Sequence, residues 1–309
     1  MKLAFLYAGQ GSQHVGMGRD LYEAYPVFRQ VLDSAPVEFD LKSLCFDGPE
    51  EQLNDTRYTQ PCMVAFAAGV TAVLKEAGIV PEYAAGLSLG EYSALQCAGV
   101  FDAPTAISLV AFRGQAMASA VQGRPCGMAA VLGMDRESLK AVCGEASDAG
   151  VVECTNFNCP GQIVISGDAA AVDKAGALAK AAGAKRVLPL KVSGPFHTSL
   201  MAPAGDALRE KFKSVTFGEM EIPVLFNCLG DLKGERDTIP NLLEQQVQSS
   251  VYLEDTIRRL HELGVDTVVE IGPGRALSGF VKKTAKEIKC YPVETVSELE
   301  AAITALKGE

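Results

Sequence analysis

Hydrophobic and polar residues follow two different spacings along this chain, and together they predict an α/β protein. The apolar run of residues 3–7 has the length of a buried strand and leads into a glycine-rich segment, residues 8–11. At the far end of the chain, Ser297 and Glu300 predict a capping box for a final helix. Residues 104–121 carry apolar or small side chains at helical spacing, which predicts a helix with one apolar side: Ile107, Val110, Gly114, Met117 and Val121.

The middle of the chain predicts a separate small subdomain. Its order, β-α-β-β-α-β, is that of a ferredoxin-like unit. We therefore expect a ferredoxin-like subdomain at residues 125–197, inserted into a large α/β domain that residues 1–124 and 198–309 form around a mainly parallel sheet. The pattern consists of a strand at 128–132, a helix at 136–149, strands at 151–156 and 162–166, a second helix from Asp168, and a strand at 186–192.

Residues 86–90 (GLSLG) have the G-x-S-x-G form of a nucleophile elbow, in which a strand turns sharply into a helix. A strand-like segment, 83–85, precedes them, and a helix-like segment, 91–98, follows. In such a turn Ser88 exposes its hydroxyl, and the N–H of Leu89 points to where an oxyanion would form. An ordinary turn is the competing interpretation, because the chain has 30 glycines. The order of strand, elbow and helix favours a catalytic serine in an α/β-hydrolase-like domain.

A serine nucleophile needs a base, and the chain has only three histidines. His261 lies in an amphipathic helical segment, which indicates a partly solvated residue near the end of a helix. His14 follows a glycine-rich loop and stays a second candidate. His197 ends the loop SGPFH, directly after a strand-like segment, where functional residues collect. We therefore expect His197 to be the base.

The loop after the first strand is a candidate for the rest of an oxyanion hole, because its glycines leave backbone N–H groups accessible. The competing interpretation is a dinucleotide-binding turn. That interpretation fails because the third glycine is Gly16, which breaks the G-x-G-x-x-G spacing. A G-x-x-x-x-G-K-[ST] phosphate-binding loop is also absent from the sequence.

Arg113 lies on or beside the apolar side of the predicted helix 104–121. A buried arginine needs a partner, yet no Asp or Glu occurs between Asp102 and Asp135. The partner must come from another segment. A structural ion pair or a snorkelling side chain explains this arginine as well as a clamp for a substrate carboxylate does.

Composition limits the classes of protein that remain. The 309 residues are 48% hydrophobic and 21% charged, which supports a large core, and no segment approaches the ~20 apolar residues of a membrane span. The net charge of −10 argues against nonspecific nucleic-acid binding. The nine cysteines include no C-x-x-C pair, which indicates reduced thiols rather than metal ligands. Because Met1-Lys2 leads straight into a strand without a secretory signal, we expect a cytoplasmic protein.

Five motifs, in this order and spacing, resemble the malonyl-CoA:acyl carrier protein transacylases and the related acyltransferase domains of polyketide synthases. The resemblance spans essentially the whole chain, and a match in five parts is far more specific than any one motif. The motifs are residues 9–13 (GQGSQ), 86–92 (GLSLGEY), 158–162 (NCPGQ) with Ser166-Gly167, 194–197 (GPFH) and 270–274 (EIGPG).

The resemblance implies roles for particular residues. Ser88 becomes the nucleophile, His197 its general base and then acid, and Arg113 the bidentate partner of a malonyl carboxylate. The backbone N–H groups of Gln10 and Leu89 become the oxyanion donors. A carbonyl oxygen orients the histidine in this family, and the matching position is Gln246. Phe196 matches the residue that narrows the acyl pocket in malonyl-selective members.

One residue departs from the family pattern. The family usually has histidine immediately before the nucleophile, whereas this chain has Leu87, which can neither donate nor accept a hydrogen bond through its side chain. This substitution leaves the expected roles of Ser88 and His197 unchanged, but it can affect how Ser88 is positioned and so the catalytic rate.

The resemblance implies a ping-pong acyltransferase that moves malonyl from malonyl-CoA to the thiol of acyl carrier protein and supplies fatty-acid synthesis. It implies no metal or other cofactor, and we expect a monomer. A trans-acting acyltransferase of a polyketide pathway is the nearest alternative. A serine hydrolase or thioesterase shares the elbow but usually has its histidine late in the chain, and a noncatalytic carrier-binding protein would not need a nucleophile, a base and an arginine together.

Overall fold

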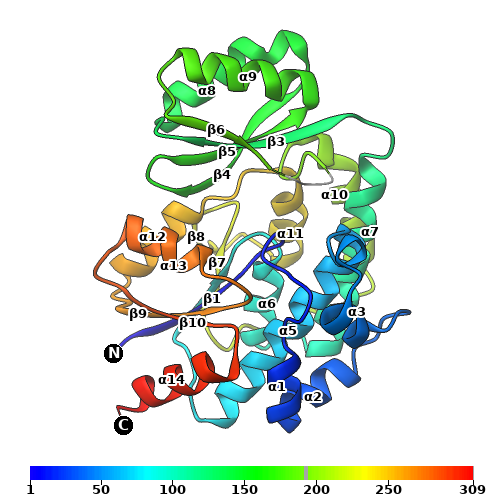
Figure 1. The fold of residues 1–309 in the computed structure, drawn as a ribbon, viewed down its shortest axis with the longest axis vertical. Helices are drawn as coiled ribbons and strands as arrows, with labels where there is room; N and C mark the ends of the chain where they lie inside the picture. Colours follow the sequence, from blue (N-terminus) through cyan, green and yellow to red (C-terminus); the bar gives the residue numbers. More distant parts are fainter. Residues whose placement is uncertain (191–193, 309) are drawn as a thin grey trace. The chain divides into compact units, whose positions relative to one another are not determined.

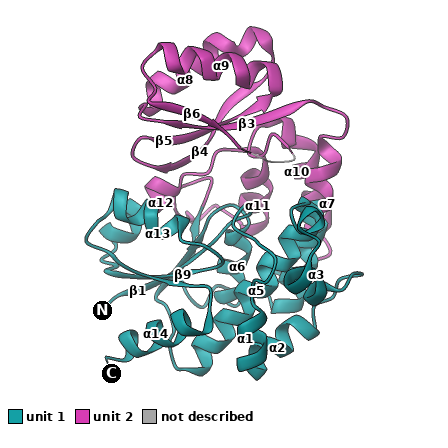
Figure 2. Ribbon diagram, viewed as in Figure 1, with its two compact units in different colours: residues 1–114, 216–226, 257–309 teal, residues 115–215, 227–256 magenta. Residues whose placement is uncertain are grey.

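The computed structural model describes residues 1–190 and 194–308 (Figure 1). They form two compact units (Figure 2). Unit 1 contains residues 1–114, 216–226 and 257–309, and unit 2 contains residues 115–215 and 227–256. Residues 191–193, where the strand predicted at 186–192 would end, lie outside the described residues.

Unit 1 is built on a parallel four-stranded sheet in the order β10-β9-β1-β2. Strand β1 is fully buried, as its unbroken apolar sequence requires. Because the strands are parallel, all of their carboxyl ends meet at one edge of the sheet, where the glycine-rich loop and the elbow both begin. The strands are β1 (Leu3–Tyr7), β2 (Tyr83–Gly86), β9 (Thr267–Ile271) and β10 (Lys289–Val293), and the short β7 (Leu225–Phe226) belongs to the same unit.

Helices cover this sheet. The 21-residue α5 is buried along most of its length, and its Thr71 hydroxyl lies 2.8 Å from the phenol oxygen of Tyr7 in β1. Helix α7 (Ala103–Ala120) matches the predicted helix 104–121 and runs on into unit 2. The other helices of unit 1 are α1 (Arg19–Ala24), α2 (Pro26–Asp33), α3 (Leu41–Asp47), α4 (Glu50–Leu53), α5 (Thr56–Glu76), α6 (Gly90–Cys97), α13 (Ala276–Thr284) and α14 (Val296–Lys307).

Unit 2 contains an antiparallel four-stranded sheet in the order β4-β5-β3-β6. Helices α8 and α9 cover one face of this sheet (Figure 1), and their apolar side chains form a core with the strands. The elements are β3 (Cys126–Leu132), α8 (Arg136–Ala146), the 3-10 turn η1 (Ser147–Ala149), β4 (Val152–Cys159), β5 (Gln162–Asp168), α9 (Ala169–Ala181) and β6 (Arg186–Pro189).

The remaining elements of unit 2 follow the small sheet in the chain. Helix α12 (Leu253–Glu262) begins in unit 2 and ends in unit 1. The others are η2 (Ser199–Met201), α10 (Ala202–Phe212), β8 (Asp231–Leu232) and α11 (Ile239–Gln248).

The predicted fold class is confirmed: a parallel sheet with helices is joined to a small antiparallel β-α-β-β-α-β unit. Unit 2 contains the segment 125–197 together with residues 115–124, 198–215 and 227–256, so the boundaries of the compact units differ from those of the expected domains. The expected domain boundaries stay a prediction.

The predicted capping box is wrong by two residues. Thr295, not Ser297, caps α14 by accepting the N–H of Glu298, and the Glu298 carboxylate accepts the N–H of Thr295 in return. The pairs Thr295/Glu298 and Ser297/Glu300 have the same i, i+3 spacing, so the sequence pattern fits either of them. The structure uses the first pair, because Thr295 has the extended backbone of an N-cap residue.

Two features of the described chain bear on function. Each helix in that part of the chain is too short or too polar to cross a lipid bilayer. The described residues also contain no group of three or more His, Cys, Asp or Glu side chains placed to hold a metal ion.

Candidate active site

Ser88 lies at a sharp turn between β2 and α6, as the G-x-S-x-G pattern predicts. Its φ is +52°, a left-handed conformation that costs a residue with a Cβ ~1 kcal/mol or more. Among the described residues only Ser88 and His197, whose φ is +63°, combine a side chain with a positive φ. Backbone strain of this kind concentrates at functional sites.

The two glycines of the elbow permit backbone contacts that no side chain would allow. A Cβ on Gly86 would lie 2.1 Å from the carbonyl carbon of Gly90, and a Cβ on Gly90 would lie 2.3 Å from the carbonyl oxygen of Tyr7. The N–H of Leu87 also donates to that oxygen over 2.9 Å. The elbow is therefore held directly against the end of β1.

Arg113 on α7 points to the elbow. Its Nη2 donates to the Ser88 hydroxyl over 3.3 Å, and its Nη1 donates to the side-chain oxygen of Gln60 over 2.9 Å. The side chain is only 1% exposed, and its guanidinium lies 5.4 Å from the centre of the Tyr92 ring. Burial lowers the pKa of Arg113, while Tyr92 and the buried Glu91 act to raise it. The guanidinium nevertheless keeps its charge, because the ordinary arginine pKa is so high.

Gln60 was missed by the sequence analysis. It lies in α5 between Thr59 and Pro61, just before the apolar middle of the helix, and is completely buried. A buried glutamine in such a helix needs a polar partner, and this was the available signal. The expectation that another segment supplies the partner of Arg113 holds, although Gln60 is a neutral amide rather than a carboxylate.

The loop after β1 is held by its own polar side chains. Gln10 Nε2 donates to the Thr56 hydroxyl over 2.8 Å, and Gln13 Nε2 donates to Asn54 Oδ1 over 2.7 Å. Gln13 Oε1 accepts the N–H of Gly11 over 2.7 Å. The side chain of Gln10 is therefore held against Thr56, the first residue of α5.

His197 and Gln246 are in contact in unit 2. His197 is 3% exposed, and its Nδ1 donates to the carbonyl oxygen of Gln246, in α11, over 2.8 Å. A carbonyl oxygen can only accept, so Nδ1 carries the proton and Nε2 is the basic nitrogen of the neutral ring. Phe196, directly before it, is buried with 8% exposure.

The other two histidines lie in different surroundings. His14 is bonded to the carboxylate of Glu294, which raises its pKa. His261 is exposed on α12, as its helical pattern predicts.

Glu270, the first residue of the EIGPG motif, has a structural task that the sequence did not reveal. Its carboxylate oxygens accept the N–H groups of Leu277 and Ser278, over 2.9 and 2.8 Å. These N–H groups belong to the first turn of α13, where helices leave donors without internal acceptors. The motif thus joins β9 to the start of α13.

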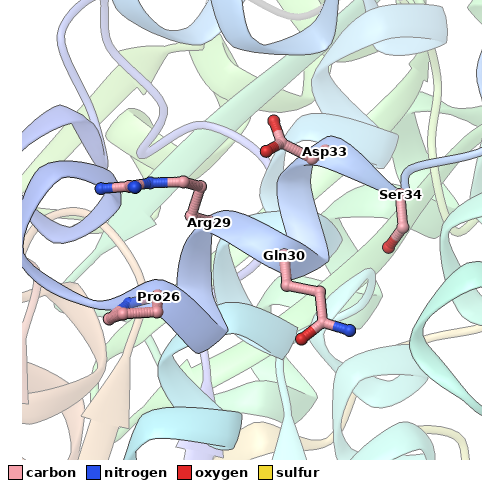
Figure 3. A pocket seen from close by; sticks show the side chains of 5 residues that line it. All are labelled: Pro26, Arg29, Gln30, Asp33 and Ser34. Carbon is pink, nitrogen blue, oxygen red and sulfur yellow. The ribbon is translucent and has the colours of Figure 1, made fainter.

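A hollow on α2 is a different kind of feature (Figure 3). Its two charged side chains are engaged with their neighbours: Asp33 accepts from Lys42 and from the Tyr22 hydroxyl, and Arg29 donates to the carbonyl oxygens of Tyr22 and Glu23. It contains none of the predicted site residues, which are in the loop after β1, the elbow, α7, the His197 segment and α11. The hollow is lined by Pro26, Arg29, Gln30, Asp33 and Ser34.

Comparisons with known proteins address the family directly. The model of the acyl transferase domain family matches residues 4–304. The malonyl CoA-acyl carrier protein transacylase of Bacillus subtilis (strain 168) is 44% identical over 311 residues, which cover 100% of this chain and 98% of the relative. The chain belongs to this family of acyl transferases. The predicted family is thereby confirmed.

Solved structures of family members agree with the fold. The malonyl CoA-acyl carrier protein transacylase from Clostridium perfringens superposes with a TM-score of 0.96 at 38% identity, covering 100% of this chain and 98% of that one. A malonyl-transacylase in complex with a type II PKS acyl-carrier protein gives a TM-score of 0.95 at 40% identity and covers both chains completely.

Proposed function

We propose that this enzyme transfers malonyl from malonyl-CoA to the phosphopantetheine thiol of acyl carrier protein and so supplies fatty-acid synthesis. The observation that carries the proposal is the buried guanidinium of Arg113, within hydrogen-bond distance of the Ser88 hydroxyl. A fixed cation beside the nucleophile suits an acyl group that ends in a carboxylate. Full-length relatives that carry this activity in their names support the same conclusion.

The reaction proceeds in two half-reactions. Ser88 Oγ attacks the thioester carbonyl of malonyl-CoA while His197 Nε2 takes its proton, and CoA leaves with that proton as a thiol. The carrier thiol then attacks the seryl ester, His197 takes the thiol proton, and Ser88 regains a proton as it leaves. The Gln246 carbonyl keeps His197 in the required tautomer by accepting from Nδ1.

Backbone donors stabilise the charge that develops on the thioester oxygen. We assign this role to the N–H groups of Gln10 and Leu89. Leu89 precedes the first turn of α6, where the N–H groups lack acceptors within the helix. The positive end of the helix dipole strengthens this site.

Arg113 and Phe196 set the choice of acyl group. The planar guanidinium binds the malonyl carboxylate through two parallel hydrogen bonds, and Gln60 holds the guanidinium in place. Phe196 narrows the acyl pocket and disfavours an α-methyl branch. Leu87 gives no polar support to Ser88 through its side chain, whereas Arg113 donates to the Ser88 hydroxyl and so helps to orient it before the substrate arrives.

The carrier protein of a polyketide pathway is the second candidate for the acyl acceptor. The observation in its favour is the 40% identical malonyl-transacylase that was solved with a type II PKS acyl-carrier protein. The chemistry at Ser88 is the same with either carrier. Comparing transfer rates to the two kinds of carrier protein distinguishes them. We further propose that the enzyme is a cytoplasmic monomer that needs no metal or cofactor.

Intact-mass spectrometry tests the function. Incubation with malonyl-CoA alone adds one malonyl group, tandem spectra place it on Ser88, and addition of holo-carrier protein removes it. Ser88→Ala abolishes the adduct. Rapid release of free malonate without a carrier would instead support a hydrolase, and an unmodified protein that still binds the carrier would support a noncatalytic role.

A further inference from the structure

His14 takes no part in the proposed reaction, yet it lies on the loop that carries Gln10. Its Nε2 is hydrogen-bonded to the carboxylate of Glu294, a residue 280 positions further along the chain, just after β10. Its Nδ1 lies 3.0 Å from the carbonyl oxygen of Val15. Both ring nitrogens thus face oxygen acceptors, and only the doubly protonated ring can donate to both.

The loop of His14, residues 9–18, packs directly against the elbow. A Cβ on Gly9 would lie 2.6 Å from the carbonyl oxygen of Leu87, the residue before the nucleophile. There is no side chain between the two backbones to absorb a displacement. A shift of this loop therefore moves the N–H of Gln10 relative to Ser88.

The loop is tied to two different parts of unit 1. Near its start, Gln10 and Gln13 are bonded to Thr56 and Asn54, close to the beginning of α5. Further along, His14 is bonded to Glu294, which is itself well anchored: its second oxygen accepts the N–H of Gly274 over 2.9 Å.

We propose that His14 and Glu294 are positioning residues: their pair holds the loop 9–18, and through it the N–H of Gln10, against the elbow, most firmly when His14 is protonated. This inference rests on the proposed function, in which that N–H stabilises the oxyanion.

Glu294 is the direct partner of His14, and several of the charged side chains around the pair are bonded to other groups. Arg19, Asp20 and Glu23 of α1 line the same hollow as His14 and Glu294. Arg19 is paired with Asp47, and Asp20 accepts the N–H of Val296. Behind Glu294, Glu298 accepts the N–H of Glu294 and is paired with Arg275.

The direction of the pH effect follows from the pKa of His14. The hydrogen bond to Glu294 raises this pKa above the ordinary imidazole value, outweighing partial burial. A group whose pKa is raised by folding contributes its full stabilisation below the ordinary value and loses it as the pH rises through the raised value. The tie is accordingly strongest in mildly acidic solution and weakens toward alkaline pH.

The test uses His14→Gln, which keeps an N–H donor near Glu294 but cannot become charged. Single-turnover acylation of Ser88 by malonyl-CoA is measured across the pH range and divided by the wild-type rate at the same pH, so that any pH dependence common to the two proteins cancels. We expect the variant to be about twofold to fivefold slower in acidic solution, as befits a partly exposed ion pair, and to match wild type above the pKa of His14. Glu294→Gln gives the same profile.

His261→Gln is the matched control, because His261 is an exposed histidine of the same unit and lies on α12 rather than on the loop. Its rate ratio is expected to be 1 at every pH. A ratio for His14→Gln that is reduced equally at all pH values, or that equals 1 throughout, overturns the proposal.

Hydrogen exchange separates this proposal from the proposed function. At one acidic pH, amides of residues 9–18 exchange faster in His14→Gln than in wild type, whereas the amides of β9 are unchanged. This readout does not need turnover. If wild type forms no seryl ester but the exchange difference is present, the proposed function fails and the tie stands. Unchanged exchange in the loop refutes the tie even when the ester forms normally.

Discussion

Ser88 and His197 share a left-handed backbone but are held in it by different means. At Ser88 the restraint is backbone against backbone: glycines at 86 and 90 allow the elbow to touch itself and the end of β1. At His197 the restraint comes from side chains, because the imidazole donates to the Gln246 carbonyl and the hydroxyl of Thr198 donates to the carbonyl of Pro195 over 2.6 Å. The comparison teaches that a strained backbone can be held in two ways: by glycines that allow backbone atoms into close contact, or by side chains that form hydrogen bonds around it.

The largest expected effect is on catalysis at His197. His197→Ala removes the base and acid of both half-reactions, so acylation and transfer each slow by about 10²–10⁴-fold. Single-turnover measurements of the two half-reactions check this. The fold is expected to survive, as circular dichroism would show. Near-normal rates in both half-reactions would mean that the base is elsewhere.

At the elbow, the largest effect is on stability. In Gly90→Ala the new methyl group meets the carbonyl oxygen of Tyr7, which cannot move without disturbing β1. We expect the free energy of unfolding to fall by ~3 kcal/mol or more, measured by urea denaturation.

Gly279→Ala is the control for that change, because Gly279 lies in α13 of the same unit with nothing within 4 Å of an added Cβ. This variant is expected to be more stable than wild type by about 0.5–1 kcal/mol. Equal effects of the two substitutions would show that the close approach at the elbow carries no cost.

Arg113→Ala has a smaller effect, and it depends on the substrate. Loss of a charged hydrogen-bond partner costs about 1.5–3 kcal/mol, so kcat/KM for malonyl-CoA should fall by about tenfold to a hundredfold. Acetyl-CoA has no carboxylate, and its kcat/KM should be unchanged or improved. Arg113→Lys should restore little, because an ammonium cannot form the bidentate pair.

Measuring kcat/KM for both thioesters in wild type and in the two variants decides the role of Arg113. An equal fall for malonyl-CoA and acetyl-CoA would make Arg113 a structural residue. Circular dichroism controls for a change of fold.

The smallest effect isolates the backbone strain itself. At each of Ser88 and His197, the glycine variant should be more stable than the alanine variant by about 1 kcal/mol, because only alanine pays for the left-handed conformation. Comparing the two variants at each position removes the loss of the side chain from the result. Urea denaturation of the four variants measures the difference. A larger gap at Ser88 than at His197 would show that the backbone of the His197 segment relaxes once the imidazole, and with it the bond to the Gln246 carbonyl, has been removed.

Features that depend on neighbours along the chain were accessible from the sequence. The elbow, the helix that carries Arg113 and the β-α-β-β-α-β order each rest on spacings within a few residues, and the structure contains all of them. The capping box shows the limit of this reasoning. Two pairs with the same spacing, two residues apart, competed for one helix start, and local sequence did not separate them.

Contacts between distant segments were not accessible from local spacing. Gln60 meets Arg113 across 53 residues and His14 meets Glu294 across 280, and both contacts needed the folded chain. The contact of His197 with Gln246, across 49 residues, was expected only from the family resemblance. Hydrophobic periodicity indicates which secondary structure a segment forms and which side it buries, so it can place Arg113 on a buried face. The glycine spacing likewise places Ser88 in a turn. Neither pattern carries information on which remote group satisfies a buried charge, because that partner is chosen by the packing of the parallel strands and their helices, which brings the ends of separate segments to one edge.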